Sequence, residues 1–169
     1  MKMESLKDLY LEQLRDLYSA ETQLVDALPK LAESATSPDL KNGFNHHLRQ
    51  TRDHVARLER IFDTLGEKPT GQTCHGMKGL VKEGEEMVKA KGDPDVHDAG
   101  LIAAAQRVEH YEIAAYGTVR AYAEVLGQSD AVLTLNRTLQ EEKDTDLKLT
   151  ELARNHINAE AHAAVAHRA

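Results

Sequence analysis

Cysteine and tryptophan are almost missing from this chain, which has one cysteine, Cys74, and no tryptophan. A lone cysteine excludes a disulfide within the chain and a metal site made of four cysteine thiolates. Any electrons used in a redox reaction would therefore come from an external donor.

Long apolar runs and an excess of positive charge are missing as well. No uninterrupted hydrophobic stretch approaches the roughly 20 residues that cross a bilayer, and the first residues contain no apolar signal segment, so we expect no membrane association and a cytoplasmic location. The formal net charge of −7 argues against nucleic acid as a partner, because affinity for phosphates rests on clustered Lys and Arg. With 169 residues, 41% of them hydrophobic, the chain predicts one well-packed domain.

Glycine and proline are few, and they separate long stretches rich in Ala, Leu, Glu and Lys. Such stretches are typical of helices, and the breaks mark where each helix ends. Residues 67–94 are rich in these breaks and predict a long connection, with one short helical piece over residues 80–91. The four long helices are expected over residues 5–34, 38–66, 95–126 and 129–158.

Capping residues at the helix ends support this division. Ser37 with proline after it predicts the start of the second helix, Gly127 the end of the third, and Ser129 the cap of the fourth. Two hairpins joined by one long crossover is the connectivity of ferritin-like bundles. We therefore predict an all-α, ferritin-like four-helix bundle over residues 1–158, followed by an Ala/His-rich C-terminal tail over residues 159–169.

An apolar seam runs along each expected helix with the spacing of bundle helices, and polar residues interrupt every seam near its middle. The interruptions are acidic in the first, third and fourth helices and include two histidines in the second. An ionised carboxylate in a dry core costs far more than its packing contributes, so protons or divalent cations must offset the charge. The acids expected to converge are Glu21, Glu109, Glu112, Glu142 and Asp146.

Carboxylates together with imidazoles favour iron, with manganese or zinc as alternatives. Two ions roughly 3.5 to 4 Å apart, bridged by glutamates, are the usual arrangement for such a set. His54 is preferred over His47 because it matches Asp146 when the two hairpins are overlaid. The predicted metal ligands are Glu21, His54, Glu109, Glu112, Glu142 and Asp146, with Gln50 and His47 as weaker candidates.

Each of these residues also has a simpler interpretation. A single glutamate in a helix seam usually points to solvent, and a core histidine is about as often hydrogen-bonded to a carboxylate as bound to a metal. The coincidence of interruptions on all four helices favours the metal site. Tyr18 is either a redox-active neighbour or a packing residue, and no catalytic residue is assigned. The histidines of the tail, His167 among them, are expected in a frayed helix.

Five runs of sequence match a known pattern: residues 9–21, 47–51, 74–84, 98–117 and 141–149. Taken together, they resemble the YciE/YciF bacterial stress-protein family over nearly the whole chain before the tail. The resemblance implies a ferritin-like bundle, a homodimer, a rubrerythrin-like metal centre and an association with stress responses, but no particular reaction. The chain departs from the ferritin pattern at Gln50, where a glutamate is expected, and at His54, which lies four residues further on instead of three.

Three functional hypotheses follow. In the first, a dinuclear iron centre reacts with oxygen or peroxide. In the second, the protein is a stress-induced structural or interaction protein whose metal only stabilises the fold. In the third, the protein stores iron in a hollow cage. The excess of predicted ligands over what folding requires favours the first hypothesis.

Overall fold

A computed structural model describes residues 3–166, whose regular structure consists of helices without strands. The predicted all-α class is therefore confirmed. In chain order the elements are α1 (Leu6–Ser34), α2 (Pro38–Leu65), α3 (His75–Lys89), α4 (Pro94–Val125), α5 (Ser129–Leu152), the π-helical turn η1 (Ala153–Ile157) and α6 (Asn158–Ala166).

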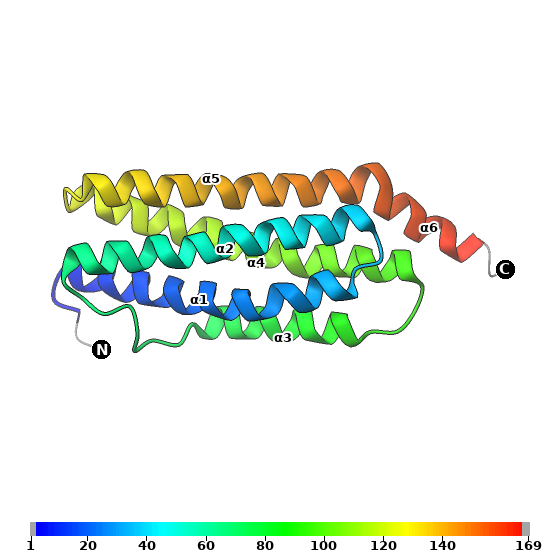
Figure 1. Cartoon of the computed structure of the whole chain (residues 1–169), viewed down its shortest axis with the longest axis horizontal. Coiled ribbons are helices and arrows are strands. Elements are labelled where there is room, and N and C mark those ends of the chain that lie inside the picture. Colours follow the sequence, from blue (N-terminus) through cyan, green and yellow to red (C-terminus); the bar gives the residue numbers. More distant parts are fainter. Residues whose placement is uncertain (1–2, 167–169) are drawn as a thin grey trace.

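The four long helices form two antiparallel hairpins that pack side by side (Figure 1). Within the hairpins α1 contacts α2 and α4 contacts α5, while α1 also packs on α4 and α2 on α5. The crossover returns along the bundle through α3, which lies against α1 and α4. This connectivity is the predicted ferritin-like one.

The helix ends agree with the sequence at three positions and differ at one. Ser37 caps α2, because its Oγ accepts a hydrogen bond from the Leu40 backbone N–H at 3.4 Å. Gly66 and Gly127 end their helices with φ of 68° and 70°, a left-handed conformation that glycine adopts at no steric cost. The prediction that Ser129 caps α5 is wrong, because Ser129 is the first residue of that helix. Gln128 is the cap residue: its backbone carbonyl accepts the first helical hydrogen bond, from the Val132 N–H at 3.0 Å, and its side chain makes no cap bond.

The turn between α1 and α2 is tied to α4 by a buried carboxylate. Asp98 is 1% exposed and accepts hydrogen bonds from the backbone N–H groups of Thr36 and Ser37, at 2.9 and 2.6 Å. The Thr36 hydroxyl donates to the same carboxylate at 2.7 Å. These bonds fix the register of the first hairpin against α4.

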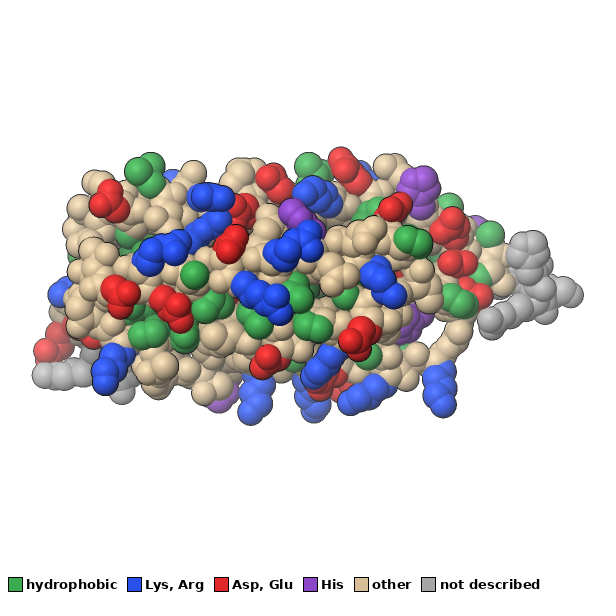
Figure 2. Space-filling view, in the orientation of Figure 1, with side chains coloured by type: hydrophobic (Ala, Val, Ile, Leu, Met, Phe, Trp, Pro, Cys, Tyr) green, Lys and Arg blue, Asp and Glu red, His purple; other side chains and the backbone are tan. Residues whose placement is uncertain are grey.

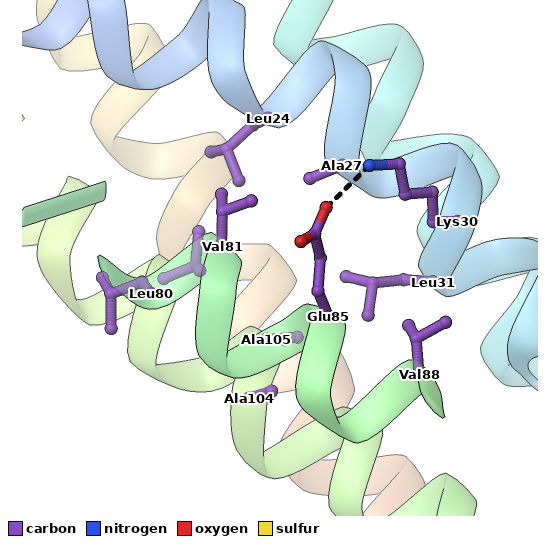
Figure 3. A pocket seen from close by; sticks show the side chains of 12 residues that line it. Leu24, Ala27, Lys30, Leu31, Leu80, Val81, Glu85, Val88, Ala104 and Ala105 are labelled. Carbon is purple, nitrogen blue, oxygen red and sulfur yellow. Dashed lines mark hydrogen bonds and ion pairs between the residues drawn. The ribbon is translucent and has the colours of Figure 1, made fainter. Parts of the chain in front are cut away.

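The crossover helix begins earlier than its predicted start at residue 80. The sulfur of Cys74 accepts a hydrogen bond from the Met77 backbone N–H at 3.3 Å and so caps α3. Gly76 lies in the first turn of α3, where a Cβ would be 2.8 Å from the Tyr111 ring. Glycine, which has no Cβ, leaves room for that ring. Further along α3, apolar side chains of α1, α3 and α4 face one another around a pocket (Figure 3). Lys30 and Glu85, which form an ion pair at 2.8 Å, also line it.

The last helix does not stop at residue 158. Regular α-helix ends at Leu152, one π-helical turn follows, and α6 continues to Ala166. The predicted domain boundary falls where η1 meets α6, and the described part of the predicted tail is helical. His167 lies outside the described residues.

Two apolar clusters fill the bundle, one toward each end. One contains Leu24, Leu28, Leu40 and Leu101, and the other contains Leu14, Leu17, Leu58, Phe62 and Leu135. Most of the buried polar side chains lie on the stretches of helix between these clusters, so the centre of the molecule is a polar layer with apolar packing on either side. They are Glu21, His47, Thr51, His54, Glu109, Glu112 and Glu142.

The surface carries interspersed acidic and basic side chains, and hydrophobic side chains appear in small groups on the face in Figure 2. Within residues 3–166, no helix has both the length and the apolar character that crossing a bilayer demands.

Candidate metal centre

Six side chains from all four long helices meet in the polar layer, and each is at most 2% exposed. Helical spacing accounts for their convergence, because residues three, four or seven apart share one face of a helix. The six are Glu21 on α1, His47 and His54 on α2, Glu109 and Glu112 on α4, and Glu142 on α5.

The six residues form two groups that share Glu142. One group contains His47, Glu109, Glu112 and Glu142, the other contains Glu21, His54 and Glu142, and the potential ligand atoms within each lie within 4.8 Å of one another. Glu142 therefore occupies the position of a bridging carboxylate, with one oxygen on each side.

Each histidine directs one ring nitrogen at the carboxylates of its group. His47 Nε2 lies 3.3 Å from Glu109 Oε1 and 3.7 Å from Glu142 Oε2. His54 Nδ1 lies 3.3 Å from Glu21 Oε1 and 2.9 Å from Glu142 Oε1. These are ion-pair distances without hydrogen-bond geometry, since neither nitrogen has a hydrogen-bond partner.

Eight potential ligand atoms of this layer are buried without a hydrogen-bond partner. Buried polar atoms are nearly always paired, so such a concentration calls for a group that the protein itself does not supply. Oxygen donors with one imidazole in each group suit iron, manganese or zinc, and the residues therefore fit a metal pair. The atoms are Glu21 Oε2, His47 Nε2, His54 Nδ1, Glu109 Oε2, both carboxylate oxygens of Glu112 and both of Glu142.

The electrostatics of the metal-free centre favour cation binding. Burial raises the pKa of Glu21, and it raises the pKa values of Glu109 and Glu112 well above the usual range, with neighbouring carboxylates adding to the effect for the last two. Burial opposes ionisation of Glu142 too, but the two histidines outweigh it and lower the pKa of that carboxyl. The layer therefore holds protons that a divalent cation would displace.

The two histidines differ in their protonation. Burial lowers the pKa of His47, so its ring is neutral and offers a lone pair. Burial also works against the charged form of His54, but the carboxylates of Glu21 and Glu142 prevail and raise its pKa to about 10. A metal at His54 would thus replace a proton.

A second layer of contacts orients the ligands. His54 Nε2 lies 2.9 Å from Glu141 Oε2, and the same carboxylate accepts two bonds from Arg57, at 2.6 and 3.1 Å. Burial by itself raises the pKa of Glu141, but its bonds to Arg57 and His54 lower it to about 2. The Tyr116 hydroxyl donates a hydrogen bond to Glu21 Oε1. Outer carboxylates that hold a histidine in this way fix its ring and raise its basicity as a ligand.

The structure places the remaining predicted residues around this centre. Asp146 is half-buried outside both groups, where it accepts a bond from Gln106 Nε2 at 3.0 Å and pairs with the exposed His110 at 3.4 Å. It lies one helical turn beyond Glu142, and its short side chain reaches α4 there. Gln50 is half-buried beside His47, and its Oε1 has no hydrogen-bond partner. Tyr18 bonds the exposed Glu59 at 3.0 Å, away from the ligands.

Sequence reasoning missed three residues: Arg57, Tyr116 and Glu141. Arg57 follows His54 by three residues on α2 and is only 6% exposed, so an arginine within one turn of a seam histidine was the available signal. Glu141 gave none, because an acid adjacent to a seam residue normally faces solvent.

The sequence pattern of DUF892, a domain of unknown function, matches residues 5–162. The chain belongs to this family. It is 43% identical over 162 residues to Protein YciF of Escherichia coli K12, covering 95% of this chain and 98% of YciF. The predicted relationship to the YciE/YciF family is therefore confirmed.

Solved structures show that this chain has the ferritin-like fold. The crystal structure of the E. coli stress protein YciF matches with a TM-score of 0.89, covering 92% of this chain and 99% of that one. YcfI from Rhodopseudomonas palustris is 46% identical, with a TM-score of 0.85 over 88% and 95% of the two chains. A ferritin-like diiron-carboxylate protein from Bacillus anthracis Ames is 19% identical, with a TM-score of 0.68 over 90% and 99%, and shows the common fold.

Proposed function

We propose that this protein binds two iron-type ions in the bundle core and uses them to react with oxygen or peroxide. The observation that carries the proposal is the set of eight buried, unpaired ligand atoms around Glu142. In this assignment His47, Glu109 and Glu112 would hold one ion and Glu21 and His54 the other, while Glu142, which belongs to both groups, would serve either ion. Manganese or zinc fits the same donors.

Bound iron would supply the change in oxidation state that reduces oxygen or peroxide. The protein's own groups have three tasks in this proposal. The apolar clusters on either side keep bulk water from the carboxylates, Glu141 holds the His54 ring, and the Tyr116 hydroxyl orients the Glu21 carboxylate by donating a hydrogen bond to its Oε1. The electrons that restore the starting state would come from an external donor.

The cellular setting of this proposal comes from the relatives. YciF of E. coli is described as a stress protein, and we extend that association to this chain as part of the proposal. A peroxide-consuming centre suits such a role.

The decisive experiment is elemental analysis of protein purified without chelators, combined with anomalous scattering from its crystals. The proposal expects two metal ions per chain, one on each side of Glu142. Ferrous-loaded protein should then be oxidised by peroxide faster than free ferrous iron. Protein without metal, or loaded protein that is inert to peroxide, would overturn it.

A stabilising role of the metal is the second candidate, and the mutual repulsion of the buried carboxylates favours it. A cation that binds only the native state stabilises it by mass action, about 2.7 kcal/mol at a concentration of 100 times Kd. A large rise in melting temperature with metal but no oxidation chemistry would select this role.

We also propose that the protein forms a homodimer, as the family resemblance implies. Native mass spectrometry would distinguish a dimer from a storage cage. A hollow assembly of many subunits would instead support iron storage.

A further inference from the structure

Gln50 lies between the two candidate histidine ligands on α2. It follows His47 by three residues and precedes His54 by four, and residues with these spacings share one face of a helix. The centroids of the two imidazole rings are 6.4 Å apart. Glu142, on the neighbouring helix α5, directs one oxygen at each ring (Figure 1). Gln50 is therefore at the same level of the bundle as the carboxylate that the two ligand groups share.

The side chain of Gln50 has an oxygen without a partner beside the centre. Its Oε1 atom is buried and takes no hydrogen bond within the part of the chain that the structure describes. Burial lowers the pKa of His47, and Glu142 and Gln50 partly offset this effect, which places Gln50 against the imidazole. Because buried polar atoms are nearly always paired, this oxygen belongs with the eight unpaired ligand atoms. An amide oxygen is a neutral donor that suits divalent ions such as manganese.

The ligand charges balance two divalent ions because residue 50 is neutral. Histidine binds metals as the neutral imidazole, so the carboxylates alone carry the negative charge. Four carboxylates supply four negative charges, against the four positive charges of two divalent cations. The four are Glu21, Glu109, Glu112 and Glu142.

Charges outside the ligand groups do not disturb this balance. The carboxylate of Glu141 is paired with Arg57 at 2.6 Å. Asp146 pairs with the exposed His110 at 3.4 Å, and 23% of its side chain is open to solvent, which screens its charge.

An unmatched charge would be costly in this layer. The six candidate ligands are at most 2% exposed, and a charge in so dry a place is tolerated only when it is paired. A glutamate at position 50 would add a fifth negative charge. Two trivalent ions would instead leave two positive charges, which only anions from solvent could neutralise. The side chains present therefore favour the divalent state of both ions.

We propose that Gln50 matches the centre to a pair of divalent ions, because it gives the ion beside His47 a neutral oxygen in place of a fifth negative charge. The inference rests on the proposed function, since it requires metal in the two ligand groups. It adds the charge state that the protein selects, which is ferrous for iron, and the residue that selects it.

A redox titration of iron-loaded protein would test the role of charge. Gln50→Glu keeps the size of the side chain and adds one negative charge, so it should favour ferric iron and lower the midpoint potential. We expect the ratio of ferric to ferrous iron at a fixed potential to rise at least tenfold, which is about 59 mV for one electron. Gln13→Glu is the matched control, because Gln13 is also half-buried but lies on α1 outside both ligand groups. Its potential should equal that of the original protein.

Gln50→Leu separates the oxygen from the charge, and it also tests the inference if Gln50→Glu does not fold. Leucine is neutral but offers no donor. The variant should therefore bind manganese several-fold more weakly, measured by competition with a chelator, while its midpoint potential moves much less than that of Gln50→Glu.

The outcomes distinguish this inference from the proposed function. An unchanged potential in Gln50→Glu, or an unchanged manganese affinity in Gln50→Leu, would overturn the role of Gln50. An equal shift of potential in Gln13→Glu would show a general effect of added charge and would also reject it. A shifted potential in protein that is inert to peroxide would support Gln50 and overturn the proposed reaction. Protein that takes up no metal would overturn both.

Discussion

His54 Nε2 lies 2.9 Å from Glu141 Oε2, and this contact determines which nitrogen of the ring faces the candidate metal centre. With Nε2 protonated and donating to Glu141, Nδ1 points at Glu21 and Glu142. Arg57 holds Glu141 in turn through two bonds. The chain from arginine to carboxylate to imidazole is thus built before a metal arrives.

Glu141→Gln should weaken metal binding on the His54 side by about 10- to 100-fold, the usual effect of removing an outer carboxylate from a histidine ligand. The amide keeps the shape but loses the charge that makes His54 a basic ligand. Competition with a chromophoric chelator would measure the affinity. Glu151→Gln, an exposed acid on the same helix, is the matched control and should retain the original affinity. Equal affinities in the two variants would remove Glu141 from the site.

Glu112→Gln should change stability and metal binding in opposite directions. Both oxygens of Glu112 are buried and unpaired, and burial raises the pKa of this carboxyl well above its usual range. A neutral amide avoids the cost of keeping this carboxyl protonated in the metal-free core at neutral pH, where the unfolded chain would ionise it, so the apo protein should gain roughly 1–3 kcal/mol. Urea unfolding in the presence of EDTA would measure the gain. The same variant should bind less metal; a loss of apo stability would show that Glu112 has an internal partner.

The interruptions at Glu21, Glu112 and Glu142 could be identified from sequence because a seam position is fixed by helical periodicity alone. The bundle followed from the same periodicity and from the position of the long crossover. Helical periodicity does not show which side chains contact a neighbouring helix. Asp146 shares a seam with Glu142, but it contacts Gln106 and lies in neither ligand group. His47, which the overlay of the hairpins made a weaker candidate than His54, lies in one of the two groups.

Local details at helix ends were predicted less well, for reasons that are also physical. Cys74 caps α3 with a sulfur, although the usual capping residues carry oxygen. Gly76 reads as a helix breaker, but it is a helix residue that accommodates the ring of Tyr111. The place of Gly76 depends on Tyr111, which is distant in the chain, whereas the cap at Cys74 is local and uses an atom that the usual capping residues lack.

Metal-free protein should lose stability as the pH rises from about 6 to 10. The folded pKa values of Glu109 and Glu112 are raised, so above about pH 4.5 the native state holds protons that the unfolded chain releases. His54, whose pKa is raised to about 10, contributes stability that is complete below about pH 6.5 and lost by pH 10. His47 acts oppositely, since its pKa is lowered, but the other three outweigh it.

Urea midpoints at several pH values, in EDTA and with saturating metal, would test this dependence. Each proton that the native state holds in excess contributes up to about 1.4 kcal/mol per pH unit. Metal should reverse the trend, because cations compete with protons and bind more tightly as the pH rises. Apo protein that gains stability between pH 7 and 9 would contradict the protonated centre.

Glu142 should control both metal positions, whereas Glu21 should control one. Glu142 is common to the two ligand groups, while Glu21 belongs only to the group with His54. Glu142→Gln should therefore lose most bound metal, and Glu21→Gln should keep about half, at the His47 side. Elemental analysis gives the amount and anomalous scattering the position. Because Gln matches Glu in size, both variants should keep the bundle, which the melting curve of the apo protein verifies. Equal loss in the two variants would mean that the groups bind metal only as a unit, and full retention in Glu142→Gln would exclude a bridging carboxylate.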